Sequence, residues 1–196
     1  MGNHEFNTDN IEGNSSKVDL YVRSILRKLF KVSNNDISYI VDVDTQLKGV
    51  DYIITTSNLD INVEIKTRFN VPPYSKYNDI GWEIMHTKDK SGINVIKKGW
   101  GLKENQLTHI IIYIFWDIKE AYVIDYIKVR SDVISNLEYF KSNYGMKPSY
   151  TMENGVVKYY TWNCFIPIEY LLNNDYIIRI YCGEKLNVKR FYRINE

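Results

Sequence analysis

The chain has 196 residues and a net charge of +1, with 25 Lys and Arg residues against 24 Asp and Glu residues. Hydrophobic residues make up 44% and charged residues 25% of the sequence, which is typical of globular proteins and excludes wholesale disorder. The near-neutral balance excludes a histone-like polycation but not a local basic groove. We expect a single domain over residues 1–196, in which residues 1–16 form a flexible N-terminal arm.

Nothing in the sequence indicates secretion or a membrane. The longest apolar runs, such as residues 110–116, fall far short of the roughly 20 residues that a membrane-spanning helix needs. The first residues carry neither a basic segment nor an apolar core, so they do not form a signal peptide. Cys164 and Cys182 are not a CxxC pair, and three scattered histidines offer no zinc-ligand spacing. We therefore expect buried thiols, a cytoplasmic protein and no membrane partner.

The N-terminal half of the chain predicts one helix followed by strands. Apolar residues recur at helical spacing from Val18 to Leu29, behind caps offered by residues 14–16. Residues 33–36 break this helix. Alternating or β-branched segments then predict three strands, joined at the last step by a turn at residues 57–60. These strands are expected at residues 37–43, 50–56 and 61–67.

The second half predicts further strands and helices after a long excursion. Residues 68–106 contain Pro72-Pro73 and several glycines and are expected to be irregular, which in a loop of this length indicates function or mobility. Beyond it we expect strands at residues 109–116, 121–129, 158–162 and 176–181, and helices at residues 130–143 and 167–173. This order predicts an α/β fold with a central mixed sheet flanked by helices.

Charged residues on the second and third strands carry the strongest functional signal. A two-residue turn at Asn58-Leu59 would place Asp51 opposite Lys66. Because opposed residues share a face and side chains alternate, Asp51, Glu64 and Lys66 would then lie together. The other face would be apolar. Two carboxylates can hold Mg²⁺, and a neighbouring lysine can stabilise developing negative charge.

Asp51 followed by Glu64-Ile65-Lys66 on consecutive strands resembles the PD-(D/E)xK nuclease superfamily, including its small phage and bacterial members. The resemblance implies a restriction-endonuclease-like fold and phosphodiester hydrolysis with Mg²⁺ or Mn²⁺, leaving a 5′-phosphate. It implies that Asp51 and Glu64 are metal ligands, that the Ile65 carbonyl is a third ligand, and that Lys66 is the catalytic lysine.

The chain departs from the family pattern at two positions. Val50 stands where many members have proline before the aspartate. Many members also add a glutamate from the first helix, but this chain has Lys17 near that place and Asp19 as a neighbouring acid. Asp19 and Glu83 are therefore our candidates for an additional acid.

A purely structural interpretation competes with the nuclease hypothesis. The same residues could form a cross-strand Asp51–Lys66 ion pair, contributing about 0.2–1 kcal/mol on a surface. Against this, Glu64-Ile65-Lys66 is the only Glu-x-Lys in the chain and lies in a strand with an apolar opposite face. The similar Asp117-Ile118-Lys119 falls at a strand end and predicts a solvated turn.

Basic residues near the motif suggest DNA as the partner. Lysines flanked by tryptophans on a long loop can follow a phosphate backbone, although a solvated loop anchored by Trp82 and Trp100 has the same pattern. The candidate DNA-binding residues are Arg68, Lys88, Lys90, Lys97 and Lys98.

Three other functions remain open on sequence grounds. The chain could be a catalytically inactive nucleic-acid-binding or protein-interaction module on the same fold. It could be a Holliday-junction-type resolvase, which would act as a homodimer on branched DNA. A structural α/β protein would bind neither metal nor nucleic acid.

Overall fold

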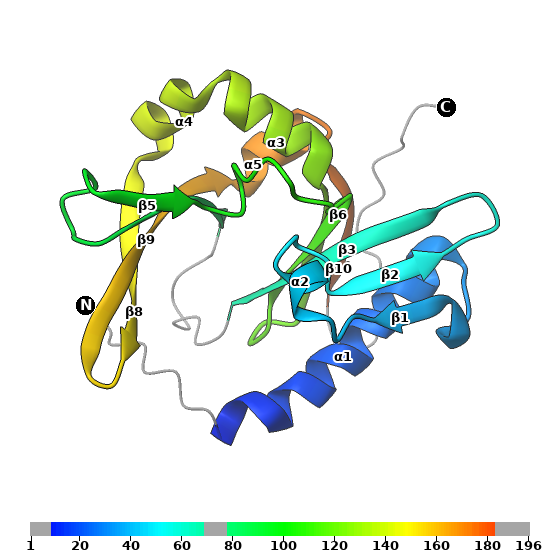
Figure 1. Cartoon of the computed structure of the whole chain (residues 1–196). Helices are drawn as coiled ribbons and strands as arrows, with labels where there is room; N and C mark the ends of the chain where they lie inside the picture. The colour runs from blue at the N-terminus through cyan, green and yellow to red at the C-terminus, as the bar shows by residue number, and fades with distance from the viewer. Residues whose placement is uncertain (1–8, 69–77, 183–196) are drawn as a thin grey trace.

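The computed structural model describes residues 9–68 and 78–182, which form helices and two β-sheets (Figure 1). The helices are α1 (Asp9–Phe30), α2 (Val43–Gln46), α3 (Tyr126–Ser135), α4 (Leu137–Tyr144) and α5 (Ile168–Asn173), with a 3-10 turn at Asn34–Asp36. The strands are β1 (Ile37–Tyr39), β2 (Tyr52–Thr55), β3 (Asp60–Arg68), β4 (Asp79–Thr87), β5 (Val95–Lys98), β6 (Ile110–Phe115), β7 (Glu120–Asp125), β8 (Met146–Glu153), β9 (Val156–Pro167) and β10 (Ile177–Cys182).

The central sheet is mixed, as the sequence predicts. Its strand order is β1-β2-β3-β6-β7-β10, and β3 and β6 are parallel while the other neighbours are antiparallel. A second, antiparallel sheet has the order β5-β4-β9-β8. Its strands β4 and β5 lie in the chain between β3 and β6, so they form part of the crossover that joins the two parallel strands.

Helix α1 covers one face of the central sheet. Val22, Ile25 and Leu26 are fully buried there, against Ile54 and Val63 among others. This is the amphipathic helix that the spacing predicts. Each fully buried aliphatic side chain contributes roughly 1.5–3 kcal/mol, so this interface fixes β2 and β3 firmly on one side.

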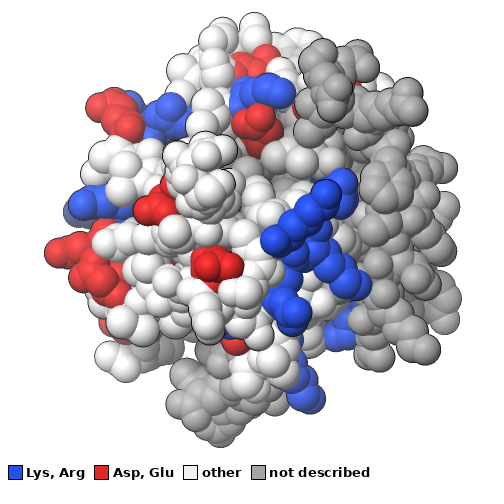
Figure 2. Space-filling view, turned by 90° about the vertical axis from the view of Figure 1, so that its right-hand side faces the viewer, with Lys and Arg blue, Asp and Glu red and all other residues white. Residues whose placement is uncertain are grey.

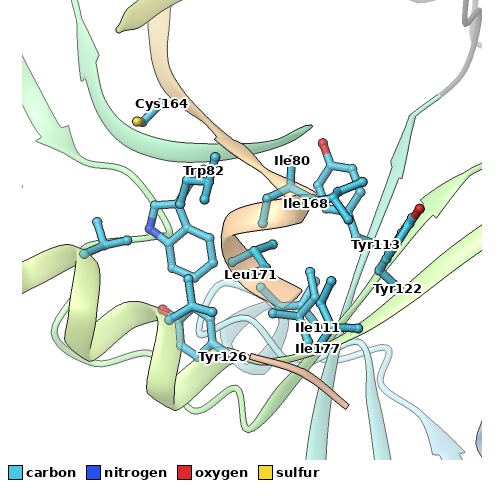
Figure 3. Packing of buried hydrophobic residues seen from close by; sticks show 14 of the residues in the cluster. Ile80, Trp82, Ile111, Tyr113, Tyr122, Tyr126, Cys164, Ile168, Leu171 and Ile177 are labelled. Atoms are coloured by element: carbon cyan, nitrogen blue, oxygen red, sulfur yellow. The ribbon is translucent and has the colours of Figure 1, made fainter. Parts of the chain in front are cut away.

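A second core on the other face joins the two sheets (Figure 3). Trp82 of β4 stacks on Tyr126 of α3, with ring centroids 5.6 Å apart. Ile111 of β6 and Leu171 of α5 are fully buried in the same cluster. Helices therefore pack on both faces of the central sheet, and the second sheet shares a core with it.

Three sequence predictions about elements are wrong. The segment predicted as irregular contains β4 and β5, and its residues 69–77 lie outside the described part. The strand β8 was not predicted at all. Residues 9–16 of the expected flexible arm belong to α1, while residues 1–8 lie outside the described residues.

Several element boundaries also differ from the predicted ones. The strand predicted to reach Val129 stops at Asp125, whose carboxylate accepts the Lys128 amide and starts α3. The helix predicted over residues 130–143 divides at Asn136, whose backbone is not helical. The strand predicted at residues 37–43 ends at Tyr39. Among the described residues, no helix combines the length and apolar character required to cross a membrane.

Candidate active site

The hairpin β2–β3 sets the faces of the candidate residues. Tyr52 pairs with Val63 and Thr55 with Asp60, so four residues, Thr56 to Leu59, connect the strands. The predicted two-residue turn and the Asp51–Lys66 pairing are therefore wrong by two positions. Because side chains alternate with a period of two, this shift leaves every residue on its predicted face. Tyr52 and Val63 are buried under α1, and Glu64 and Lys66 point to the opposite side.

Asp51 is held against the backbone of β3. Its carboxylate Oδ2 accepts the Ile65 amide at 2.7 Å, and its own amide donates to the Val63 carbonyl at 2.9 Å. Strand β2 begins only at Tyr52, so the Asp51 side chain takes the place of the missing strand partner. The amide and carbonyl of one strand residue point to the same edge. The Ile65 carbonyl is therefore directed toward the Asp51 side, as a third ligand would require.

Glu64 and Lys66 form a close ion pair. The Lys66 Nζ lies 2.5 Å from the Glu64 Oε1, and Glu64 is only 4% exposed. Burial lowers the pKa of Lys66, but attraction to Glu64 and Asp51 outweighs it, so the net pKa is raised. Lys66 therefore stays a protonated ammonium group, beside two carboxylates.

The environment of Asp51 disfavours its charged form. Burial is the largest cause, and the pKa of Asp51 is raised even though the Ile65 amide and Lys66 favour the carboxylate. The neighbouring Glu64 charge raises it further. Asp51 and Glu64 thus share a largely buried site. Among the described groups that act on Asp51, Lys66 is the cation. A divalent cation would relieve this repulsion.

Glu83 lies at the edge of the cluster on β4. Its Oε1 accepts the Trp100 amide at 3.1 Å and lies 2.8 Å from the His86 Nε2. Burial raises the pKa of Glu83, but these hydrogen bonds and the charges of His86 and Lys66 lower it overall. Glu83 also raises the pKa of Lys66. Glu83 is therefore close enough to Lys66 to influence its charge, as expected of an additional acid at the site.

The structure does not bring Asp19 to this cluster. Asp19 accepts the Tyr52 hydroxyl at 2.6 Å and pairs with Arg23 at 3.0 Å. Both contacts lie on the α1 side of the central sheet, whereas Glu64 and Lys66 lie on the other. As a candidate additional acid, Asp19 is thus misplaced.

Two further residues lie at the site although the sequence does not predict them there. The buried Thr108 hydroxyl donates to the Gly49 carbonyl at 2.6 Å and lies 3.3 Å from the Glu64 Oε2. No sequence signal marks Thr108. Trp100 lies with its ring centroid 5.1 Å from the Lys66 Nζ, and its flanking glycines were a usable signal. A Cβ on Gly99 would lie 2.6 Å from the Glu83 carbonyl oxygen, so only glycine fits this crossing.

The predicted DNA-binding residues do not form one group. Arg68 pairs with Asp79 at 3.1 Å and lies over three aromatic rings. Lys97 and Lys98 are neighbours on β5, but Lys98 pairs with Glu104 at 2.5 Å while Lys97 lies over the Tyr159 ring. The remaining candidates, Lys88 and Lys90, are exposed in the β4–β5 connection.

The donor set suits a hard cation. Two carboxylates and one carbonyl are oxygen ligands, and Mg²⁺ usually keeps several waters and needs only one or two protein carboxylates. Asp51, Glu64 and Ile65 therefore fit such an ion. No cluster of three or more His, Cys, Asp or Glu residues suited to metal binding occurs within residues 9–68 and 78–182, so the site would depend on two carboxylates and water.

Comparisons with known proteins found no matching family model, no matching curated protein and no matching solved structure.

Proposed function

We propose that the protein is a metal-dependent nuclease of the PD-(D/E)xK type that hydrolyses phosphodiester bonds, with DNA as its substrate. The observation that carries the proposal is the joint position of three side chains at the part of β3 that extends beyond its pairing with β2. Asp51 binds the Ile65 amide while Glu64 binds Lys66. The antiparallel β2–β3 hairpin and the parallel β6 beside it support the restriction-endonuclease-like arrangement.

Each residue of the cluster has a distinct role in this proposal. Asp51, Glu64 and the Ile65 carbonyl would hold Mg²⁺ or Mn²⁺. A bound cation of this kind polarises a phosphoryl oxygen and lowers the pKa of a bound water. Lys66 holds a positive charge next to the reacting phosphate and stabilises the negative charge that grows there. Trp100 covers the lysine on one side and limits the positions that its ammonium group can take.

An ion pair that only stabilises the fold explains the arrangement less well. A buried ion pair generally contributes little net stability, because removing both charges from water costs about as much as their attraction returns. Here a second carboxylate, Asp51, adds repulsion rather than compensation. Asp51 also accepts the Ile65 amide, but that contact needs a hydrogen-bond acceptor and not a charge. Keeping all three charges together has a clear chemical use.

The test is cleavage of a substrate panel by the full-length protein. Supercoiled plasmid, a four-way junction and single-stranded DNA are incubated with Mg²⁺, Mn²⁺ or EDTA. The proposal expects cleavage with either cation and none with EDTA, with 5′-phosphate ends. Preference for the junction would identify a resolvase, which would act as a homodimer. Binding without cleavage on any substrate would contradict the proposal and favour an inactive nucleic-acid-binding module.

A further inference from the structure

One face of the second sheet is turned away from the shared core. In the β4–β9 ladder Ile80 opposes Ile166 and Trp82 opposes Cys164, and all four are buried in that core. The alternate residues must point the other way.

The residues on this second face follow from the register. Gly81 pairs with Phe165 and Glu83 with Asn163. After a bulge, His86 pairs with both Thr161 and Lys97. On the outer strand, Lys147 pairs with Asn163. We call this surface the clamp face, defined by Lys97, Lys147, Tyr159, Thr161, Asn163 and Phe165.

The clamp face adjoins the candidate active site. A Cβ on Gly81 would lie 3.5 Å from both the Arg68 Nη2 and the Tyr113 hydroxyl, and 3.7 Å from the Phe165 ring. Tyr113 is the β6 neighbour of Lys66. Glu83, on the same face of β4, acts electrostatically on Lys66. The Gly81–Phe165 end of the clamp face therefore adjoins β3 and β6 next to Lys66.

Two pairs of a lysine and an aromatic ring lie on this surface. The Lys97 Nζ lies 5.7 Å from the Tyr159 ring centroid, and the Lys147 Nζ lies 5.7 Å from the Phe165 ring centroid. Both lysines are exposed, and both rings are half-buried. Between the two pairs, Thr161 and Asn163 offer neutral hydrogen-bonding groups. Lysines that contact phosphates, combined with aromatic platforms for bases or sugars, are the usual components of a nucleic-acid groove.

We propose that the clamp face binds the phosphodiester backbone of the substrate strand and leads it to Lys66. The inference rests on the proposed function. It assigns different roles to two neighbouring lysines that the sequence analysis treats alike. Lys97 contacts the substrate, whereas Lys98, paired with Glu104, does not. The charge of the surface favours a polyanion, since both acids that β4 places on this face have cationic or hydrogen-bonding partners: Asp79 pairs with Arg68, and Glu83 is held by His86 and the Trp100 amide.

A second basic surface lies elsewhere. Figure 2 shows a band of Lys and Arg side chains on the side of the molecule where α1 ends. The last turn of α1 exposes Arg27 and Lys28, and the exposed Lys31 follows the helix directly. Because α1 packs on the opposite face of the central sheet from Glu64 and Lys66, a strand bound there would not be continuous with the catalytic cluster.

Two double variants test the clamp face. Lys97→Gln with Lys147→Gln removes the two proposed contacts. The matched control, Lys98→Gln with Lys158→Gln, removes two exposed lysines of the same sheet that already pair with Glu104 and Glu153. Affinity for a labelled single-stranded oligonucleotide of about 20 nucleotides is measured by anisotropy, in EDTA so that no cleavage occurs, over a range of salt concentrations.

The clamp variant should bind roughly 20-fold more weakly at 0.1 M salt, and its salt slope should fall by about 1.4, since each lost phosphate contact contributes about 0.7 on single strands. The control should match wild type. Equal slopes for both variants, or no binding by wild type, would overturn the inference. Cleavage by wild type is measured separately with Mg²⁺, so that failure of the clamp face can be told from failure of the proposed function. If wild type cleaves DNA but the clamp variant binds it as tightly as wild type, only the clamp face is refuted. If binding depends on the clamp lysines but wild type does not cleave, only the nuclease function is refuted.

Discussion

Strands β3 and β6 are parallel neighbours at the centre of the same sheet, yet their side chains differ on one face. Every residue of β6 is buried and apolar in character, as expected for a strand covered on both sides. On the face where β6 carries Ile111, Tyr113 and Phe115, β3 carries Glu64, Lys66 and Arg68 at the paired positions. Their other faces are alike, packed under α1.

This difference separates residues that hold the fold from residues that serve chemistry. Aliphatic side chains at the β3 positions would extend the core at no electrostatic cost. The chain instead buries charges there and surrounds them with groups of matching polarity, such as the Thr108 hydroxyl. The contrast predicts that changes in β6 reduce stability, whereas changes in β3 reduce activity by more than any loss of stability explains.

The largest effect is expected at Lys66. Lys66→Met keeps the length of the side chain but removes its charge, so cleavage should fall about 100- to 1000-fold, the usual cost of losing one electrostatic contact to the transition state. Because the variant leaves the buried Glu64 carboxylate without its partner, the thermal midpoint should also fall, so the rates are compared at a temperature at which both proteins are folded. Initial cleavage rates at saturating Mg²⁺ measure the effect.

The control for Lys66 is the other Asp/Glu-x-Lys lysine of the chain. Lys119→Met alters the turn between β6 and β7, where Lys119 lies over the Trp116 ring. It should cleave at the wild-type rate. If both variants lost activity equally, the assignment of Lys66 as the catalytic lysine would fall.

The next effect sharpens the comparison from the β6 side. Ile112 is fully buried between the sheet and α1, so Ile112→Ala should lower the free energy of unfolding by about 2–5 kcal/mol. Urea unfolding followed by circular dichroism measures it. Val95→Ala on the exposed strand β5 should stay within about 0.5 kcal/mol of wild type. Comparable losses in the two variants would mean that this core is not closely packed.

A smaller effect is expected where the chain crosses β4. Gly99→Ala would push a Cβ against the Glu83 carbonyl, and overpacking of this kind costs roughly 1–3 kcal/mol. Because the shift moves Trp100 away from Lys66, cleavage should fall more than stability alone explains. Comparing cleavage at a temperature where both proteins are fully folded isolates that part. Full activity there would show that Trp100 does not position the lysine.

The smallest effect concerns Asp51 in the absence of metal. Since burial raises its pKa in the folded state, the carboxylate destabilises the metal-free fold at neutral pH. Asp51→Asn should therefore raise the unfolding midpoint in EDTA at pH 7. The gain should shrink as the pH falls through the raised pKa toward the ordinary aspartate pKa of 3.8, because Asp51 is then protonated in both states. A destabilised variant at pH 7 would contradict the electrostatic account.

The sequence predicts the faces of the site better than its surroundings. The alternation of Val63, Glu64, Ile65 and Lys66 determines which side chains share a face. The predicted faces are correct although the predicted register is wrong by two residues. The error arose because the Thr56 hydroxyl accepts the Leu59 amide and lengthens the turn. Such a local hydrogen bond has no reliable sequence signature.

The second sheet was harder to predict because its strands carry mixed patterns. A bulge between Glu83 and Met85 interrupts the alternation of β4, and the glycines nearby suggested a loop. One signal was overlooked: Asn154-Gly155 has positive φ at both residues and joins β8 to β9, the turn that hairpins favour most. The clamp face depends on this sheet and could not be derived without it.

Metal binding tests the central claim most directly. Mn²⁺ is titrated into metal-free wild type and into Glu64→Gln by calorimetry, with circular dichroism to confirm that both are folded. We predict one Mn²⁺ site in wild type and at least about tenfold weaker binding in the variant, the scale on which a perturbed metal site loses affinity. Equal affinity in the two proteins, or no binding by wild type, would contradict the assignment of Asp51, Glu64 and Lys66 as a metal-dependent catalytic cluster.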